Sequence, residues 1–285
     1  MTGARMRNRH ATDALSAQAV KLRLDSVGKR FDTGATATVA VSDFTLDVRQ
    51  GEFLVVVGPS GCGKTTVLNV LAGLEQPTTG SVTIDGRSIR GPGPDRGVMF
   101  QDYALFPWHT VWGNVEFGLR HGPAGEGLDA TARQKRVRSY VDLVGLGGAE
   151  TKYPHQLSGG MRQRVALARL MANEPEVLLM DEPLAALDAQ TRLILQDELL
   201  RIWGQDRPAR ERRTVVFITH AIDEAVFLAD RVAVMTTHPG RLKAVIDVDL
   251  ARPRGDATRA LPRFQSLCQH IWSLIRDEAY RATVT

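Results

Sequence analysis

The feature that most constrains the fold of this chain is the run 58-GPSGCGKT-65, which fits the pattern G-x-x-x-x-G-K-[ST]. A continuously apolar segment, 53-FLVVV-57, precedes it and is typical of a strand buried on both faces. A helical pattern follows over residues 65–74, and we expect that helix to end near Gly73. The alternative is a glycine turn that matches the pattern by chance, but such a turn would not need a buried strand before it and a helix after it. The sequence therefore predicts a phosphate-binding loop, because glycine-rich turns at helix starts present backbone N–H groups to phosphate.

The other strand and helix patterns predict a mixed α/β protein. Apolar strands at 177–181, 214–220 and 231–236 alternate with helices such as 191–203, which indicates a parallel sheet. The first third of the chain instead contains strand patterns with little helix between them, so we expect an antiparallel part there. These patterns are a mixed strand at 22–26, an alternating strand at 44–48 and a hairpin at 81–89 that turns about Asp85-Gly86.

We divide the 285 residues into three parts. Residues 1–18 contain several arginines but no apolar stretch, so we predict a disordered tail and no secretory signal. Residues 19–255 are the main domain, in which the helix-rich region of about 103–172 is predicted to be a helical subdomain. Residues 256–285 are expected to be a helical extension that packs back on the body through an amphipathic helix at 261–279. The apolar stripe of that helix comprises Leu261, Phe264, Leu267, Ile271, Leu274 and Ile275.

Composition excludes several classes of protein. An apolar content of 43% is ordinary for a soluble globular protein, and no apolar run approaches the roughly 20 residues of a transmembrane helix. Two cysteines provide no disulfide framework and suit a reducing compartment. The net charge of +4 comes from scattered arginines, which we interpret as solvated faces and not as a nucleic-acid groove. A basic surface would also suit the cytoplasmic face of a membrane.

Four residues next to the predicted strands have side chains suited to phosphate chemistry. Lys64 can reach the β- and γ-phosphates of a nucleotide, and the Thr65 hydroxyl can ligate Mg²⁺. Asp181 ends the strand in 177-VLLMDEP-183, where a further Mg²⁺ ligand is expected. Glu182 beside it can polarise an attacking water as a general base. A salt-bridged strand end is the alternative, and the phosphate-binding loop upstream argues against it.

Two further side chains carry weaker signals, and a second glycine turn raises a question. His220 ends an apolar strand and could hold a water at the γ-phosphate, although a lone strand-end histidine is more often structural. Gln101 follows another strand pattern and could sense Mg²⁺ or water. Residues 158–160, Ser-Gly-Gly, open the helical pattern of 157-LSGGMRQRVALARL-170. Such a turn can bind phosphate, yet it has no lysine of its own, so a second phosphate-binding turn in one chain needs an explanation.

In this order, the motifs resemble those of the nucleotide-binding subunit of an ATP-binding cassette (ABC) transporter. The resemblance spans roughly residues 20–250 and implies an α/β fold with a P-loop NTPase core. That fold has a mixed sheet, an N-terminal antiparallel β part and an inserted helical subdomain. The resemblance also implies an ATPase with ATP and Mg²⁺ as cofactors. The motifs that carry it are 58-GPSGCGKTT-66, Gln101, 157-LSGGM-161, 177-VLLMDEP-183, 185-AALD-188 and His220.

The resemblance assigns a role to each matching residue. Glu182, His220 and Gln101 would be catalytic, and Phe31 is the candidate for stacking on adenine. The Mg²⁺ ligands would be Thr65, Gln101 and Asp181. The nucleotide would be bound by Gly58, Pro59, Ser60, Gly61, Cys62, Gly63, Lys64, Thr65 and Thr66, and by Ser158, Gly159 and Gly160. Two positions depart from the commonest pattern, Met161 in place of glutamine and Ala185 in place of serine, but neither removes a phosphate ligand.

The resemblance also explains the second glycine turn. In the family, two chains close head-to-tail over two ATP molecules, and the turn at 158–160 of one chain serves the nucleotide in the other chain's loop. Asp188 would lie at that interface. Since no membrane span is present, the pore would be formed by transmembrane permease subunits, with a periplasmic or extracellular substrate-binding protein acting indirectly. The apolar segment 103–119 would be a groove for a short cytoplasmic permease helix, or simply subdomain core.

The segments 104-ALFPWHTVWGNVEFGL-119, 181-DEPLAALDAQTR-192 and 218-ITHAIDEAVFLADRV-232 are similar to importer ATPases of the nitrate, taurine and alkanesulfonate group. We therefore expect an ATP-hydrolysing importer subunit at the cytoplasmic face of the inner membrane, energising uptake of a small anion.

The main alternative is a soluble non-transport ABC ATPase, which typically carries a coiled-coil insertion or a second cassette, and we find neither pattern. An exporter ATPase and a kinase with the same loop are two further alternatives, although nothing explains LSGGM in a kinase.

Overall fold

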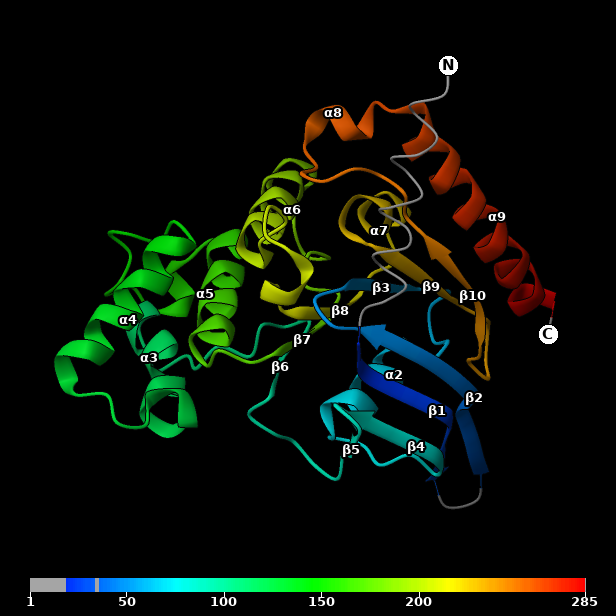
Figure 1. Ribbon diagram of the computed structural model, residues 1–285, viewed down its shortest axis with the longest axis horizontal. Coiled ribbons are helices and arrows are strands. Elements are labelled where there is room, and N and C mark those ends of the chain that lie inside the picture. The colour runs from blue at the N-terminus through cyan, green and yellow to red at the C-terminus, as the bar shows by residue number, and fades with distance from the viewer. Residues whose placement is uncertain (1–18, 34–35, 285) are drawn as a thin grey trace.

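The computed structural model describes residues 19–33 and 36–284, so the predicted tail at 1–18 lies outside the described residues. Its strands form two sheets, with strand orders β10-β9-β3-β8-β7-β6 and β2-β1-β4-β5 (Figure 1). The strands are β1 (Val20–Thr33), β2 (Thr36–Arg49), β3 (Phe53–Val57), β4 (Thr79–Ile84), β5 (Arg87–Ser88), β6 (Arg96–Met99), β7 (Val177–Asp181), β8 (Thr214–Ile218), β9 (Arg231–Met235) and β10 (Leu242–Asp247).

The six-stranded sheet is mixed, and β3 lies within it between β8 and β9. The strands from β9 to β6 pair in parallel, whereas β10 pairs antiparallel with β9. All five side chains of β3 are buried. Because successive side chains of a strand point to opposite faces, Phe53, Val55 and Val57 join the core on one face and Leu54 and Val56 the core on the other. The continuously apolar run is therefore explained by burial on two faces.

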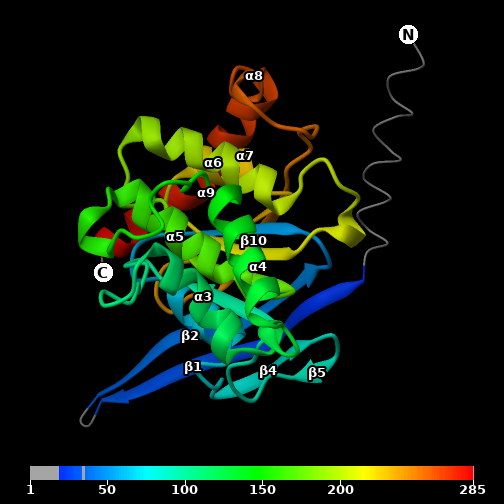
Figure 2. The same ribbon diagram turned by 90° about the vertical axis from the view of Figure 1, so that its left-hand side faces the viewer.

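The N-terminal strands are longer than the sequence predicted. β1 and β2 have 14 residues each and form the antiparallel ribbon at the lower edge of Figure 2, where short strands at 22–26 and 44–48 were expected. The register of this pair shifts between Leu24 and Val27, and Ser26 has a φ of 50°. Such a bulge interrupts the alternation of side chains, so a periodic pattern ends there although the strand continues.

Two other predictions about strands have different outcomes. The hairpin about Asp85-Gly86 is confirmed, because β4 and β5 are antiparallel and the two turn residues have φ values of 49° and 73°, which favour a tight primed turn. Sequence analysis missed β10. Its run, 242-LKAVID-247, mixes charged and apolar residues without strict alternation, and its side chains are mostly half-buried.

The helices lie on both faces of the six-stranded sheet and in a separate lobe. α2 (Lys64–Ala72) follows the phosphate-binding run and ends at Gly73, as predicted. The region 103–172 contains the helices of the lobe at the left of Figure 1. This architecture agrees with the predicted α/β fold, and the boundaries of the subdomain stay a prediction. The lobe helices are α3 (Val111–His121), α4 (Ala130–Leu143) and α5 (Gly159–Ala172), and those that follow are α6 (Ala189–Trp203) and α7 (Ile222–Leu228).

The C-terminal extension consists of α8 (Asp256–Arg259) and α9 (Pro262–Val284), and α9 runs beside β10 in Figure 1. Of the predicted apolar stripe, Phe264, Leu267 and Ile271 are buried, and the next two members, at 274 and 275, are half-buried. Leu261 is 44% exposed, so its inclusion in the stripe was wrong. The reason is that α9 begins one residue later, at Pro262, and Leu261 precedes the helix.

A buried ion pair joins the start of β3 to the neighbouring strand β9. Glu52 is 1% exposed, and the Arg231 guanidinium donates to both of its carboxylate oxygens, at 2.5 and 2.9 Å. Glu52 directly precedes β3, and Arg231 begins β9. The pair therefore links the start of the strand that leads to the phosphate loop with its neighbour in the sheet.

We predict that Arg231→Met lowers the free energy of unfolding by about 3–5 kcal/mol, because it leaves a buried carboxylate without its cation. Urea denaturation followed by circular dichroism measures this change. The control is Arg23→Met, which removes the exposed Arg23–Asp47 pair and should change the free energy of unfolding little, because solvent screens a pair at the surface. Similar losses in the two variants would contradict a special role for the buried pair.

Candidate functional site

The predicted phosphate-binding loop wraps around the start of α2. Gly63 immediately precedes α2 and has a φ of 93°, a left-handed conformation that favours glycine. The Lys64 ammonium donates to the backbone carbonyls of Gly58 and Pro59, each at 2.9 Å. The lysine is therefore folded over the loop, where a phosphate group would replace the carbonyl oxygens as its partner.

Close backbone packing behind the loop explains two of its glycines. A Cβ on Gly58 would lie 2.9 Å from the Cys62 sulfur and 3.1 Å from Cβ of Met235. A Cβ on Gly63 would lie 2.8 Å from the carbonyl oxygen of Ala40. Side chains do not fit at these distances, so the rear of the loop is pressed against β2 and the end of β9. On the other side, Ser60, Gly61 and Thr65 are exposed and available to a ligand.

Asp181 and Thr65 come together at the end of β7. Asp181 is 7% exposed, and the Thr65 hydroxyl hydrogen-bonds to its carboxylate. Burial raises the pKa of Asp181, while the Thr65 hydrogen bond and the charge of Lys64 oppose that shift. A carboxylate and a hydroxyl in contact beside a phosphate-binding loop fit Mg²⁺, which binds through few protein oxygens and the phosphates of a nucleotide.

Glu182 and His220 come together from the ends of neighbouring strands. His220 Nδ1 lies 3.0 Å from Glu182 Oε2, and β7 and β8 are adjacent in the sheet. Glu182 has a φ of 44°, and its N–H donates to the Ile218 carbonyl at 3.0 Å. A non-glycine residue in this conformation is strained, which is common at functional sites. The arrangement places a base and an imidazole at the same edge of the sheet as Asp181.

A buried polar cluster beneath His220 was missed by sequence analysis. Glu224 is 3% exposed, accepts from Gln196 Nε2 at 3.1 Å and is hydrogen-bonded by the Thr219 hydroxyl. Burial raises the pKa of Glu224. Since Thr219 directly precedes His220, the cluster supports the backbone that carries the histidine. The available signal was a pair of acidic residues, Asp223 and Glu224, at the start of the helical pattern 222-IDEAVFL-228, of which only the second is buried.

Gln101 lies just after β6 and is exposed at the start of a strained loop. Tyr103 and Ala104 have φ values of 62° and 43°. The Arg169 guanidinium of α5 donates to both of their carbonyls, at 2.9 and 2.7 Å. Arg169 was also missed, because 65 residues separate it from Ala104. The loop that follows Gln101 is therefore fastened to the helix that begins with the second glycine turn.

The second glycine turn does not lie beside the phosphate loop of its own chain. Ser158 is exposed, and its hydroxyl accepts from the Met161 N–H as the N-cap of α5. Figure 1 shows α5 well apart from α2. A Cβ on Gly160 would lie 3.0 Å from a methyl group of Thr191, so α6 approaches the turn closely. Asp188 caps that helix by accepting from the Thr191 N–H at 2.9 Å. Ser158 and Gly159 are thus free of the chain's own phosphate site.

Phe31, the predicted adenine contact, lies in β1 and is half-buried against the core under the antiparallel sheet. The Lys29 ammonium lies 4.9 Å from the centre of its ring. One part of the ring therefore remains accessible, and its role in nucleotide binding stays a prediction.

Comparison with known proteins identifies the family. The family described as "ABC transporter" matches residues 41–185, which include the phosphate loop, Gln101, the second glycine turn and Asp181-Glu182. The chain belongs to the ABC transporter ATP-binding family. It is therefore an ATPase that uses ATP and Mg²⁺, and the predicted fold class is confirmed.

Relatives and a solved structure extend this likeness to most of the chain. An uncharacterised ABC transporter ATP-binding protein of Methanocaldococcus jannaschii is 48% identical over 92% of this chain and 94% of its own. The nitrate import ATP-binding protein of Synechococcus elongatus is 47% identical over 86% of this chain and 88% of its own length. The aliphatic sulfonates import ATP-binding protein of Bacillus licheniformis is 45% identical over 85% of this chain and 89% of its own length. Among solved structures, a dimeric ATP-binding cassette in a post-hydrolysis state with ADP and Pi matches with a TM-score of 0.70 and 31% sequence identity. The match covers 80% of this chain and 98% of that cassette.

The apolar segment of this ABC ATPase around residue 106 borders a surface hollow. Phe106 and Phe117, with ring centres 4.5 Å apart, line a hollow of about 230 Å³ together with Arg169 and Leu170. Trp108 next to it is 68% exposed. Among the residues that the structure describes, no helix is long and apolar enough to cross a membrane.

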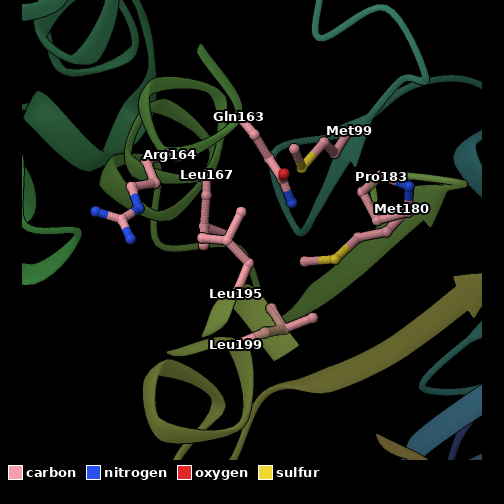
Figure 3. Close-up of a pocket in the computed structure, with 8 residues that line it drawn as sticks. All are labelled: Met99, Gln163, Arg164, Leu167, Met180, Pro183, Leu195 and Leu199. Carbon is pink, nitrogen blue, oxygen red and sulfur yellow. The ribbon is translucent and has the colours of Figure 1, made fainter. Parts of the chain in front are cut away.

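A second, much smaller cavity lies between α5 and the end of β7 (Figure 3). Its volume is about 10 Å³, and its lining is apolar except for Gln163 and Arg164. Gln163 is 5% exposed, and within the described residues its side-chain oxygen has no hydrogen-bond donor. Because a buried water needs two or more polar partners, this cavity is a poor water site. The buried amide oxygen therefore costs about 1–3 kcal/mol of stability.

We predict that Gln163→Leu raises the free energy of unfolding by about 1 kcal/mol, since leucine has a similar volume and brings no unsatisfied oxygen. The midpoint of urea denaturation measures it. Gln265→Leu, at an exposed position of α9, is the control and should change the midpoint little. A destabilised Gln163→Leu protein would mean that the amide has a partner in solution.

Proposed function

We propose that this chain hydrolyses ATP at a site made of the 58–66 loop, Thr65, Asp181, Glu182 and His220. The observation that carries the proposal is the 3.0 Å contact between Glu182 and His220 beside the buried Asp181. The loop and Lys64 would bind the phosphates, while Thr65, Asp181 and Gln101 would hold Mg²⁺. Bound Mg²⁺ would supply positive charge that stabilises the phosphate oxygens in the transition state. Glu182 would accept a proton from the attacking water, and His220 would hold that water.

We further propose that the working unit is a head-to-tail dimer of this chain. The exposed Ser158 at the start of α5, far from its own α2, supports this arrangement. The N-terminal N–H groups of α5 would then add positive potential at the γ-phosphate bound by the partner chain. The similar cassette of known structure is dimeric, which also supports the proposal. Asp188 would lie at the contact between the two chains.

The proposed role is to drive the import of a small anion such as nitrate, taurine or an alkanesulfonate. Identities of 47% and 45% with nitrate and aliphatic sulfonate import proteins support this class of substrate. Separate transmembrane permease subunits would form the pore, and a periplasmic or extracellular substrate-binding protein would deliver the anion to them. A short cytoplasmic helix of a permease would occupy the 230 Å³ hollow, with Phe106, Phe117 and Trp108 as apolar contacts. The chain would therefore work at the cytoplasmic face of the cell membrane.

We predict that Glu182→Gln lowers kcat by about 100-fold or more while ATP still binds, because glutamine cannot accept the proton. ATPase assays and nucleotide titration measure the two properties. The trapped ATP should also hold the variant as a dimer on gel filtration with ATP and Mg²⁺. The control is Glu174→Gln, a carboxylate ahead of β7, away from the strand end that carries Asp181, and it should keep wild-type turnover. A monomeric Glu182→Gln protein with bound ATP would contradict the shared site.

The substrate class can be tested by growth of a strain that lacks this gene. Nitrate is supplied as the only nitrogen source, and taurine or an alkanesulfonate as the only sulfur source. We expect growth to fail on one of them and to be restored by the wild-type gene but not by Glu182→Gln. Normal growth on all three would remove the support for this anion class. Recovery of the protein away from membranes would instead favour the soluble non-transport ATPase.

A further inference from the structure

The turn between β9 and β10, residues 236–241, is packed against the rear of the phosphate loop. Gly240 approaches the loop so closely that a Cβ on it would collide with the backbone carbonyl of Cys62. The Gly240 N–H donates to the Ala40 carbonyl at 2.9 Å, and the Gly240 carbonyl accepts from the Ser42 N–H at 2.9 Å. Ala40 is also the residue whose carbonyl lies behind Gly63. The turn and the rear of the phosphate loop are therefore in direct backbone contact.

The last turns of α9 hold this turn through one buried carboxylate. Glu278 is 2% exposed and accepts from the Thr237 N–H at 3.1 Å and from the Thr237 hydroxyl at 3.4 Å. The Lys243 ammonium of β10 donates to Glu278 at 2.7 Å and to the Leu274 carbonyl of α9 at 2.9 Å. The carboxylate thus ties three elements together, with the turn on one side and the helix on the other.

We propose that Glu278 is a positioning residue for nucleotide binding, and that α9 sets nucleotide affinity by holding residues 236–241 behind the phosphate loop. The inference rests on the proposed binding of nucleotide by residues 58–66. Its route runs from Glu278 to Thr237, along the turn to Gly240, and from there to Cys62 in the loop. α9 lies outside the 41–185 match to the family, so this contact is not part of the segment that defines the family.

The position of the contact determines which kinetic constant should change. The loop holds phosphate groups in the ground state and in the transition state alike. A change that displaces the loop should weaken both states equally, which raises KM and leaves kcat unchanged. Coupling between the two places is reciprocal, so bound nucleotide should in turn strengthen the contact between Glu278 and the turn.

The test is the variant Glu278→Ala in the full-length chain, with ADP affinity measured by calorimetry and with ATPase kinetics. We expect ADP binding and KM for ATP to weaken about tenfold, within the usual range of such couplings, with kcat within about twofold of wild type. Asp249→Ala is the matched control. It removes a carboxylate that pairs with Arg263 of α9 at the surface, and it should change neither constant. A merely structural role would lower the active fraction in proportion and leave the dissociation constant unchanged, which would overturn the inference.

Two further variants keep the result clear. Thr237→Val removes the hydroxyl on the turn side of the contact and should weaken ADP in the same direction but less, so it decides the question if Glu278→Ala does not fold. Lys64→Ala tests the proposed nucleotide site itself. If Lys64→Ala retains ADP binding, the proposed function fails. If Lys64→Ala loses binding while the Glu278 and Thr237 variants bind like wild type, only the present inference fails.

Amide hydrogen exchange provides a readout that does not depend on catalysis. We expect saturating ADP to slow exchange of the Thr237 amide in the wild-type protein, because that N–H donates to Glu278. The same slowing should be absent in Glu278→Ala. Equal slowing in both proteins would overturn the proposed link between the helix and the loop.

Discussion

The two-sided burial of β3 is the constraint on which the rest of the structure depends. A strand with all five side chains buried must have a hydrophobic layer on each face, and the two cores of this protein meet at that strand. Parallel neighbours on both sides bring the ends of β7 and β8 to the same edge of the sheet as the phosphate loop. The proposed catalytic groups therefore share one edge because the sheet is parallel, although they are far apart in the sequence.

Support for these groups comes from buried polar residues behind them. Glu224 holds Thr219 next to His220, Arg169 holds the loop after Gln101, and Glu278 holds the turn behind the phosphate loop. Each has an ionisable side chain in a buried or half-buried place, where a polar group without a hydrogen-bond partner would lower the stability of the fold. The bonds that these residues make to the loops go to backbone groups or to a threonine hydroxyl, so they fix the geometry of the loops without touching the nucleotide site themselves.

The sequence was sufficient to predict those features of the fold and of the site that depend on residues close together in the chain. The phosphate loop, the strand ends at Asp181 and the hairpin at Asp85-Gly86 follow from local periodicity and from turn chemistry. It was insufficient where a bulge breaks the period, as at Ser26, and for an edge strand such as β10. It also missed Arg169 and Glu278, because their partners are 65 and 41 residues away. Contacts of that range depend on how elements pack, which no local pattern records.

Backbone strain in the loop after Gln101 and at Glu182 shows why such distant support is needed. Tyr103, Ala104 and Glu182 all have positive φ values, and each such conformation costs about 1–3 kcal/mol. The strained residues persist only where other contacts over-determine them, as Arg169 does for the first two and the Ile218 carbonyl for the third. A loop held in this way is suited to respond to the gain or loss of a phosphate group, because a single ligand contact is comparable in energy to the strain that it opposes.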